Sequence, residues 1–191
     1  MPITDAQFET TISALEPALA HKKARLHVYL PVDPELMKVS LGNAAHDHKK
    51  LIEDTYRFIK NAAAMGAEIE FSPEGYSRMA KNFDFVSDVI RAAITAGATI
   101  INCPDTIGGG CKLQGDDYFV KKMQQHAALM CREFPHKNIT WSTHCHNDFN
   151  LKKSKLFQIF YIKICCPANL IGPSRVKMLQ NIVLVGILMR S

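Results

Sequence analysis

The sequence predicts an α/β fold in which parallel strands alternate with helices. Segments whose apolar residues recur at helical spacing alternate with shorter segments rich in β-branched and aromatic residues. The helix-to-strand junctions Met-Gly-Ala-Glu-Ile-Glu and Ala-Gly-Ala-Thr-Ile-Ile also resemble each other, as the junctions of a repeated unit do. Such a repeat is typical of a parallel sheet built from βαβ units.

The first half of this pattern contains two helices and two strands. Residues 4–20 begin with Thr and Asp, which cap helices, and continue with apolar residues at helical spacing. Arg25–Pro31 is short and rich in β-forming residues, so it predicts the first strand. Residues 46–65 carry an apolar stripe that ends before Gly66, which predicts a helix, and Ala67–Phe71 predicts the second strand.

The second half repeats the same order. Residues 82–96 begin with Asn, a common helix cap, and are followed by Gly97, which ends the predicted helix. Ala98–Cys103 predicts the third strand, residues 116–133 the next helix, and Asn138–Thr143 the fourth strand.

Four such units occupy about 145 residues, whereas a closed (β/α)8 barrel needs about 250. We therefore expect residues 1–150 to form a partial TIM (β/α)8 barrel of about four βα units, followed by a non-matching C-terminal tail. The composition changes at this boundary, because residues 151–191 hold seven of the 23 Lys and Arg residues and none of the 18 Asp and Glu residues. We interpret residues 151–191 as a divergent basic and apolar tail, and hypothesise that they are translated out of frame.

Composition excludes several classes of protein. The net charge of +5 belongs to the tail, since the first 150 residues carry −2, and this body shows no sign of nucleic-acid binding. The apolar run 182–189 is too short to span a membrane, and no secretory signal opens the sequence. The six cysteines show no CxxC spacing, which favours reduced thiols. We expect a cytoplasmic protein.

Polar residues gather where each predicted strand ends. Because the carboxyl ends of parallel strands form the ligand site of α/β folds, these residues indicate an active site at that end of the sheet. The candidates are His27, Ser72, Glu74, Thr106, His144 and His146.

Two His-x-His triplets allow a comparison. His46 and His48 lie at a predicted helix start, where residues two apart point to nearly opposite sides, so we interpret them as part of a solvated turn. His144 and His146 continue a strand, where residues two apart share a face and both imidazoles can reach one ion. Asp148 follows in the same register and could orient a ligand.

The other candidates each have two interpretations. Glu74 is either a surface carboxylate in a turn or a group that transfers protons beside the metal. Thr106 is either a helix cap or a hydroxyl donor to a substrate carboxylate. His27 is either a satisfied core histidine or part of the site. Gly108–Gly110 resembles a flexible loop more than a phosphate cradle.

Three motifs identify a related family. Glu-Phe-Ser-Pro-Glu at 70–74, Ala-Gly-Ala-Thr-Ile-Ile-Asn-Cys-Pro-Asp-Thr-Ile-Gly at 96–108 and Ser-Thr-His-Cys-His-Asn-Asp at 142–148 closely resemble 2-isopropylmalate synthases. These enzymes belong to the barrel metallolyase and Claisen-condensing group, with homocitrate synthase and hydroxymethylglutaryl-CoA lyase. The resemblance covers roughly residues 3–150.

The resemblance implies an acyltransferase that condenses acetyl-CoA with 2-oxoisovalerate in leucine biosynthesis, usually as a homo-oligomer. His144 and His146 would bind a divalent cation, Zn, Mn or Mg, that polarises the keto carbonyl. His27, Ser72 and Thr106 match positions of the keto-acid pocket. Glu74 matches an active-site carboxylate that handles protons.

The sequence departs from the family at both ends. No Asp-Gly-x-Arg strand precedes His27, and no Gly-Glu-Arg-x-Gly-Asn segment follows Asp148. We therefore expect a truncated chain that is inactive alone. Two alternatives stay open: a homocitrate synthase or related acyl-CoA lyase, and a non-catalytic fragment that pairs with another barrel chain.

Overall fold

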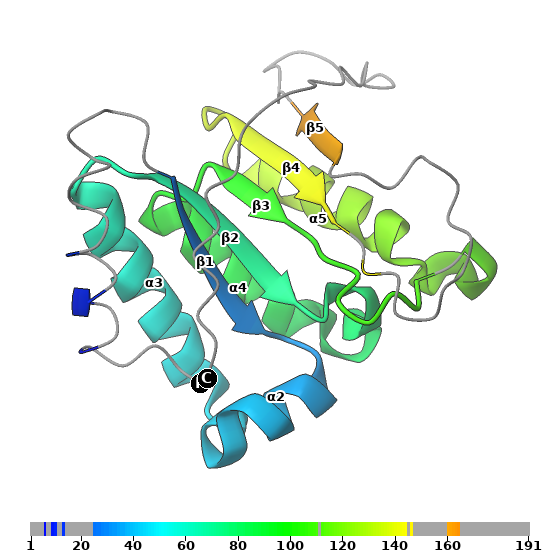
Figure 1. The fold of residues 1–191 in the computed structure, drawn as a ribbon. Helices are drawn as coiled ribbons and strands as arrows, with labels where there is room; N and C mark the ends of the chain where they lie inside the picture. The colour runs from blue at the N-terminus through cyan, green and yellow to red at the C-terminus, as the bar shows by residue number, and fades with distance from the viewer. Residues whose placement is uncertain are drawn as a thin grey trace.

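The computed structural model describes residues 25–110, 112–144, 146 and 160–164, together with residues 6, 9, 10 and 13. In these residues, five strands form one sheet in the order β1-β2-β3-β4-β5 (Figure 1). The first four pair in parallel and the fifth runs antiparallel to β4. The strands are β1 (Arg25–Pro31), β2 (Glu68–Glu74), β3 (Ile100–Asn102), β4 (Ile139–Thr143) and β5 (Phe160–Ile164).

Helices connect the parallel strands, and three short 3-10 segments lie between them. Figure 1 shows α4 and α5 behind the sheet and α3 along its β1 side. The helices are α2 (Pro34–Leu41), α3 (His48–Ala64), α4 (Phe83–Ala96) and α5 (Phe119–Glu133), and the 3-10 segments are η1 (Gly42–His46), η2 (Tyr76–Asn82) and η3 (Lys112–Asp117). Four parallel strands alternating with helices confirm the predicted α/β fold and are consistent with a partial barrel.

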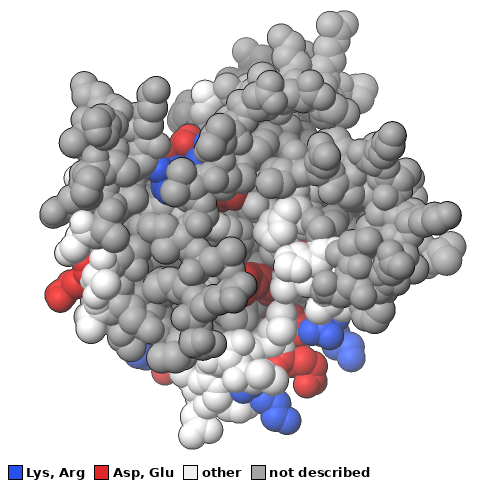
Figure 2. Space-filling model, in the orientation of Figure 1, with Lys and Arg blue, Asp and Glu red and all other residues white. Residues whose placement is uncertain are grey.

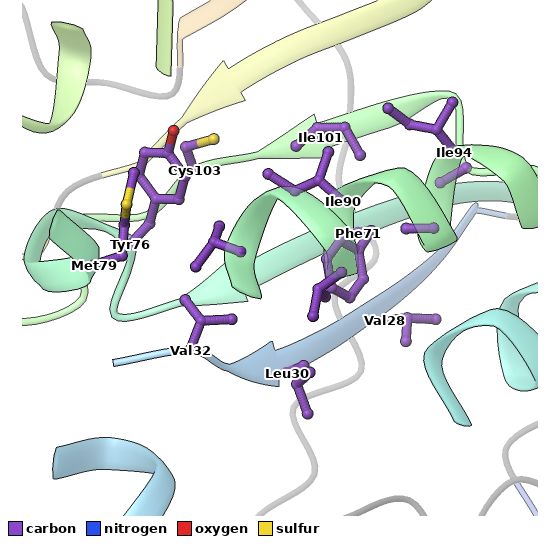
Figure 3. Close-up of a cluster of buried hydrophobic side chains, with 14 of the residues drawn as sticks. Val28, Leu30, Val32, Phe71, Tyr76, Met79, Ile90, Ile94, Ile101 and Cys103 are labelled. Atoms are coloured by element: carbon purple, nitrogen blue, oxygen red, sulfur yellow. The ribbon is translucent and has the colours of Figure 1, made fainter. Parts of the chain in front are cut away.

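The hydrophobic core lies between the sheet and these helices. Along β1, β2 and β4, apolar residues recur at alternate positions and face the helical layer. Figure 3 shows Val28 and Leu30 of β1, Phe71 of β2 and Ile101 of β3 packed in one cluster with Ile90 of α4. Phe71, Ile90 and Ile101 are completely buried. This contact holds the helices on one face of the sheet.

Local capping explains where two helices begin. The Asp47 carboxylate accepts from the Lys50 backbone N–H at 3.0 Å, which starts α3 as the His-Asp-His turn suggested. Asp33 caps α2 in the same way, through the Leu36 N–H at 3.0 Å, and Pro34 follows at the first helical position.

Several predicted boundaries need correction. β2 continues past Phe71 to Glu74, while β3 is limited to Ile100–Asn102. The last helix starts at Phe119 rather than residue 116, because η3 occupies the preceding residues. The α2 helix was not expected. Most of the helix predicted at 4–20 and the domain boundary at 150 lie outside the described residues, as does the tail 151–191 except for β5.

Charged side chains of the described residues are mixed on the surface. On the face drawn in Figure 2, the coloured basic and acidic groups lie close to one another. The Arg91 Nε donates to Glu133 at 2.6 Å, and the Lys50 Nζ donates to Asp54 at 2.9 Å. No helix among the described residues is long and apolar enough to cross a membrane.

Candidate active site at the carboxyl ends of the strands

The face of the sheet that points away from the helices is polar. Strand alternation places Arg25 and His27 of β1 on it, and the pairing of β2 with β3 and of β3 with β4 brings further polar residues alongside. Four of these polar side chains are at least 96% buried: Glu70, Ser72, Asn102 and Ser142. Buried polar groups need hydrogen-bond partners, so their contacts define the site.

The first contact joins β1 to β2. The His27 Nε2 and the Ser72 Oγ lie 2.6 Å apart. His27 is half-buried on the polar face, so it does not belong to the apolar core between sheet and helices. Its hydrogen bond to Ser72 joins two of the residues that the sequence nominated.

A second chain of contacts crosses three strands. The Arg25 guanidinium donates to the Glu70 carboxylate at 3.4 Å, and the Asn102 amide donates to the other Glu70 oxygen at 2.7 Å. The Asn102 Oδ1 lies 3.1 Å from the His144 Nδ1. The buried carboxylate is thus linked to the candidate metal ligand through one amide.

His144 and His146 lie just beyond the end of β4, not within it. Their backbones nevertheless follow the neighbouring segment: the Asp105 N–H donates to the His144 carbonyl at 2.9 Å, and the His146 N–H donates to the Asp105 carbonyl at 3.1 Å. The two imidazole centroids are 5.6 Å apart. The adjacent rings that strand alternation predicted are therefore present, although the strand itself ends at Thr143.

Glu74 and Thr106 occupy neighbouring strand ends. Glu74 is the last residue of β2 and half-buried, so it is not a surface carboxylate in a turn. The Thr106 Oγ accepts from the Gly75 N–H at 2.8 Å. Thr106 lies ahead of η3 and α5 and caps neither of them. Because its oxygen accepts from Gly75, its own proton can be donated to a ligand.

Burial and neighbouring charges set the protonation of these groups. Burial raises the pKa of the Glu74 carboxyl above its ordinary value, and the electrostatic effect of nearby His146 partly opposes the shift. Burial lowers the pKa of His27 and of His144, and the adjacent imidazoles lower the pKa of His144 further. Neutral imidazoles are the form that binds metal ions.

The two histidines fit half of a metal site. Among the described residues, no group of three His, Cys, Asp or Glu side chains is arranged to hold a metal ion. A pair of adjacent imidazoles supplies two of the four to six donors that a divalent cation takes; imidazole suits Zn, and oxygen donors beside it would suit Mn or Mg. Asp148, named from the sequence as an orienting group, lies outside the described residues.

Sequence reasoning missed Arg25, Glu70 and Asn102. It looked for polar residues after the strands, whereas these three lie within them. Period-two alternation was the available signal, because Glu70 shares a strand face with Ser72 and Glu74. The burial of Glu70 and Asn102 depends on contacts between strands, which alternation alone does not reveal.

Comparison with known proteins shows which proteins the chain is similar to. The family model described as HMGL-like matches residues 5–152. The chain is similar to 2-isopropylmalate synthase of Stenotrophomonas maltophilia, with 33% identity over 147 residues, covering 76% of this chain and 25% of the relative. It is also similar to the 2-isopropylmalate synthases of Neisseria meningitidis serogroup B, at 31% identity over 68% of this chain and 23% of the relative, and of Polynucleobacter asymbioticus, at 34% over 66% and 22%. The chain thus spans about a quarter of the length of these relatives.

Proposed function

The chain belongs to the HMGL-like family, whose model covers residues 5–152, and from this premise we propose that it forms part of the active site of a metal-dependent Claisen-condensing enzyme. The reaction is the condensation of acetyl-CoA with 2-oxoisovalerate, as the similarity to 2-isopropylmalate synthases suggests. The observation that carries the proposal is the meeting of four strand ends, where the His144–His146 pair lies beside the half-buried carboxyl of Glu74.

In this proposal His144 and His146 hold a divalent cation, Zn, Mn or Mg. A cation held there would supply Lewis-acid chemistry at the keto carbonyl. The 2-oxo acid binds in front of β1, β2 and β3. His27 and Ser72 line its pocket, and the Thr106 hydroxyl donates to its carboxylate while accepting from the Gly75 N–H.

Glu74 handles the proton in the condensation. The acetyl methyl group must lose a proton before it attacks the keto carbon, and a carboxylate within reach can accept it. Burial raises the pKa of Glu74 towards the working pH, which makes its carboxylate a stronger base. His146 opposes part of this rise in the pKa of Glu74.

Ligand binding is the readout suited to a chain that spans about a quarter of its relatives' length. We expect Mn²⁺ binding, followed by calorimetry, to weaken at least about 10-fold in His144→Gln, and 2-oxoisovalerate binding to require the ion. His46→Gln provides the matched control, because it alters the other His-x-His triplet, at an exposed helix start. Equal Mn²⁺ affinity in both variants would contradict the proposed site.

Substrate choice separates the two enzymatic alternatives. A 2-isopropylmalate synthase should select the branched, uncharged side chain of 2-oxoisovalerate, whereas a homocitrate synthase should select the second carboxylate of 2-oxoglutarate. Competition between the two acids for the Mn²⁺-loaded chain measures this preference. Tighter binding of 2-oxoglutarate would overturn the assignment within the family.

A further inference from the structure

We propose that Glu70 and Asn102 form a positioning relay that holds the neutral His144 ring with its proton on Nδ1, so that Nε2 is the nitrogen presented to a cation. The relay itself is a property of the hydrogen bonds between β2, β3 and the end of β4. Its purpose rests on the proposed function, which makes His144 a metal ligand.

The relay begins at the buried carboxylate. Glu70 is completely buried, and its two oxygens have different partners: Arg25 at 3.4 Å on one and the Asn102 amide at 2.7 Å on the other. A carboxylate paired with a guanidinium accepts hydrogen bonds and has none to donate. Whatever faces Glu70 must therefore be a donor.

This requirement orients the Asn102 amide. Its NH2 group must face Glu70, since the reversed amide would place two acceptor oxygens about as close as that hydrogen bond in a buried site. The Oδ1 then faces His144, 3.1 Å from the ring Nδ1. An amide oxygen only accepts, so the Nδ1 must carry the proton.

The consequence is a ring whose Nε2 carries a lone pair instead of the proton. The His144 and His146 ring centroids lie 5.6 Å apart, so an ion shared by the two rings would take the lone pair of this nitrogen. Metal-binding histidines are commonly held in this way through the nitrogen that does not bind the metal. Glu70 and Asn102 touch neither cation nor substrate in the proposal and are positioning residues.

Nitrogen NMR of the [15N]His-labelled chain at pH 8, where ordinary histidines are neutral, measures the tautomer directly. The two ring nitrogens of each tautomer have distinct shifts, and the His144→Gln spectrum identifies the signals of His144. We expect His144 to be protonated at Nδ1 in the unaltered chain. Protonation at Nε2 would overturn the relay.

Two substitutions should have different effects on the tautomer, because the first should shift it and the second should leave it unchanged. In Glu70→Gln, the one remaining oxygen should face Arg25, so the new NH2 faces Asn102 and reverses its amide, and His144 should shift to the Nε2-protonated form. In Asn102→Asp, the new carboxyl group must hold a proton to supply the donor that Glu70 requires, and its other oxygen keeps an acceptor opposite His144, so Nδ1 should stay protonated. Glu68→Gln is the control, because it removes a half-exposed carboxylate that also pairs with Arg25 but has no hydrogen bond to Asn102. An unchanged tautomer in Glu70→Gln, with a native-like amide spectrum, would overturn the relay.

Metal titration provides the second readout. Co²⁺ absorption should show affinity about 10- to 100-fold weaker in Glu70→Gln, and within about 2-fold of the unaltered chain in Glu68→Gln. Equal weakening in both variants would mean that charge near Arg25, not the relay, governs the site. If the unaltered chain binds no Co²⁺, the proposed metal function fails, while the tautomer spectra still decide the relay.

Discussion

The two faces of the sheet are held in place by different interactions. On the helical side the side chains are apolar, and Val28, Phe71 and Ile101 are positioned by the shape and volume of their packing. On the other side, Glu70 and Asn102 are buried just as deeply but are held by specific donors and acceptors. The same strands therefore carry a face that determines the fold and a face that determines the chemistry.

This difference has an energetic consequence. An apolar core side chain contributes through the area it buries, so its loss is measured as lost stability. A buried polar group gains little net free energy from its hydrogen bonds but costs a great deal when one partner is removed. We therefore expect substitutions on the helical face to affect stability most, and substitutions on the polar face to affect geometry and ligand binding most.

Phe71→Ala should have the largest effect on stability. Phe71 is completely buried in the cluster between β2 and α4, and removal of such a ring costs about 3–5 kcal/mol of unfolding free energy. Urea denaturation followed by circular dichroism measures the loss. Glu68→Gln on the opposite face of the same strand should cost less than about 1 kcal/mol. A loss below about 1.5 kcal/mol for Phe71→Ala would break the comparison.

Acid should lower the free energy of unfolding, because a buried histidine on the helical side must stay neutral in the folded protein. His126 of α5 is completely buried, with Tyr76 Oη at 2.7 Å from Nδ1 and Ser87 Oγ at 2.9 Å from Nε2. The Ser87 hydroxyl donates to the Phe83 carbonyl, so the Nε2–H donates to Ser87 and Tyr76 donates to Nδ1. Burial lowers the pKa of His126 from 6.5 to about 4.

The unfolded chain therefore binds more protons than the folded one between these two values. Stability due to the neutral ring is complete above pH 6.5 and falls as the pH drops towards 4, by about 3 kcal/mol. Burial also lowers the pKa of His27 and His144, which adds to the trend. Urea midpoints from pH 7 to pH 4 test this, and the slope should be smaller in His126→Gln. An equal slope in that variant would exclude His126 as the main cause.

Gly75→Ala, at the end of the polar face, should lower the unfolding free energy less than Phe71→Ala does. Gly75 has φ of 76°, and a Cβ there would lie 2.5 Å from the Asp33 Cβ. We expect a loss of about 2 kcal/mol, from backbone strain and the collision. Because the Gly75 N–H donates to Thr106, 2-oxo acid binding should weaken as well. Gly42→Ala is the control, since it has a similar φ of 56° but an open environment. Equal losses in both variants would mean that strain alone acts.

Prediction from the sequence was most accurate where the residues of one strand or helix determine its structure locally. The β1 bounds were predicted correctly because Arg25–Pro31 is a compact run of β-forming residues. The end of β2 was placed too early because Pro73 lacks an N–H and suggests that a strand stops. In the structure only Glu70 and Phe71 pair with β3, so Pro73 needs no donor on that side. The α2 start, Asp33-Pro34, resembles a turn as much as a cap.

The candidate site could be predicted in outline only. Residues after strand ends are visible in a sequence, and the structure brings Glu74, Thr106, His144 and His146 to one edge. The role of Asn102 could not be predicted in this way, because it depends on hydrogen-bond partners that are 32 and 42 residues away in the chain. Hydrogen bonds between strands depend on register, and register is set by the packing of the whole sheet.

The smallest expected change in stability comes from replacing two serines of the polar face, which differ in their hydrogen bonds. Ser72 bonds His27 at 2.6 Å, whereas the buried Ser142 Oγ has no hydrogen-bond partner among the described residues. Ser72→Ala should therefore cost about 1 kcal/mol, while Ser142→Ala should be neutral or stabilising by up to about 1 kcal/mol, because it removes an unsatisfied buried hydroxyl. Urea midpoints at a constant denaturant slope measure both changes. A clear loss of stability in Ser142→Ala would show that this hydroxyl has a partner, and would extend the hydrogen-bonded network of the polar face to β4.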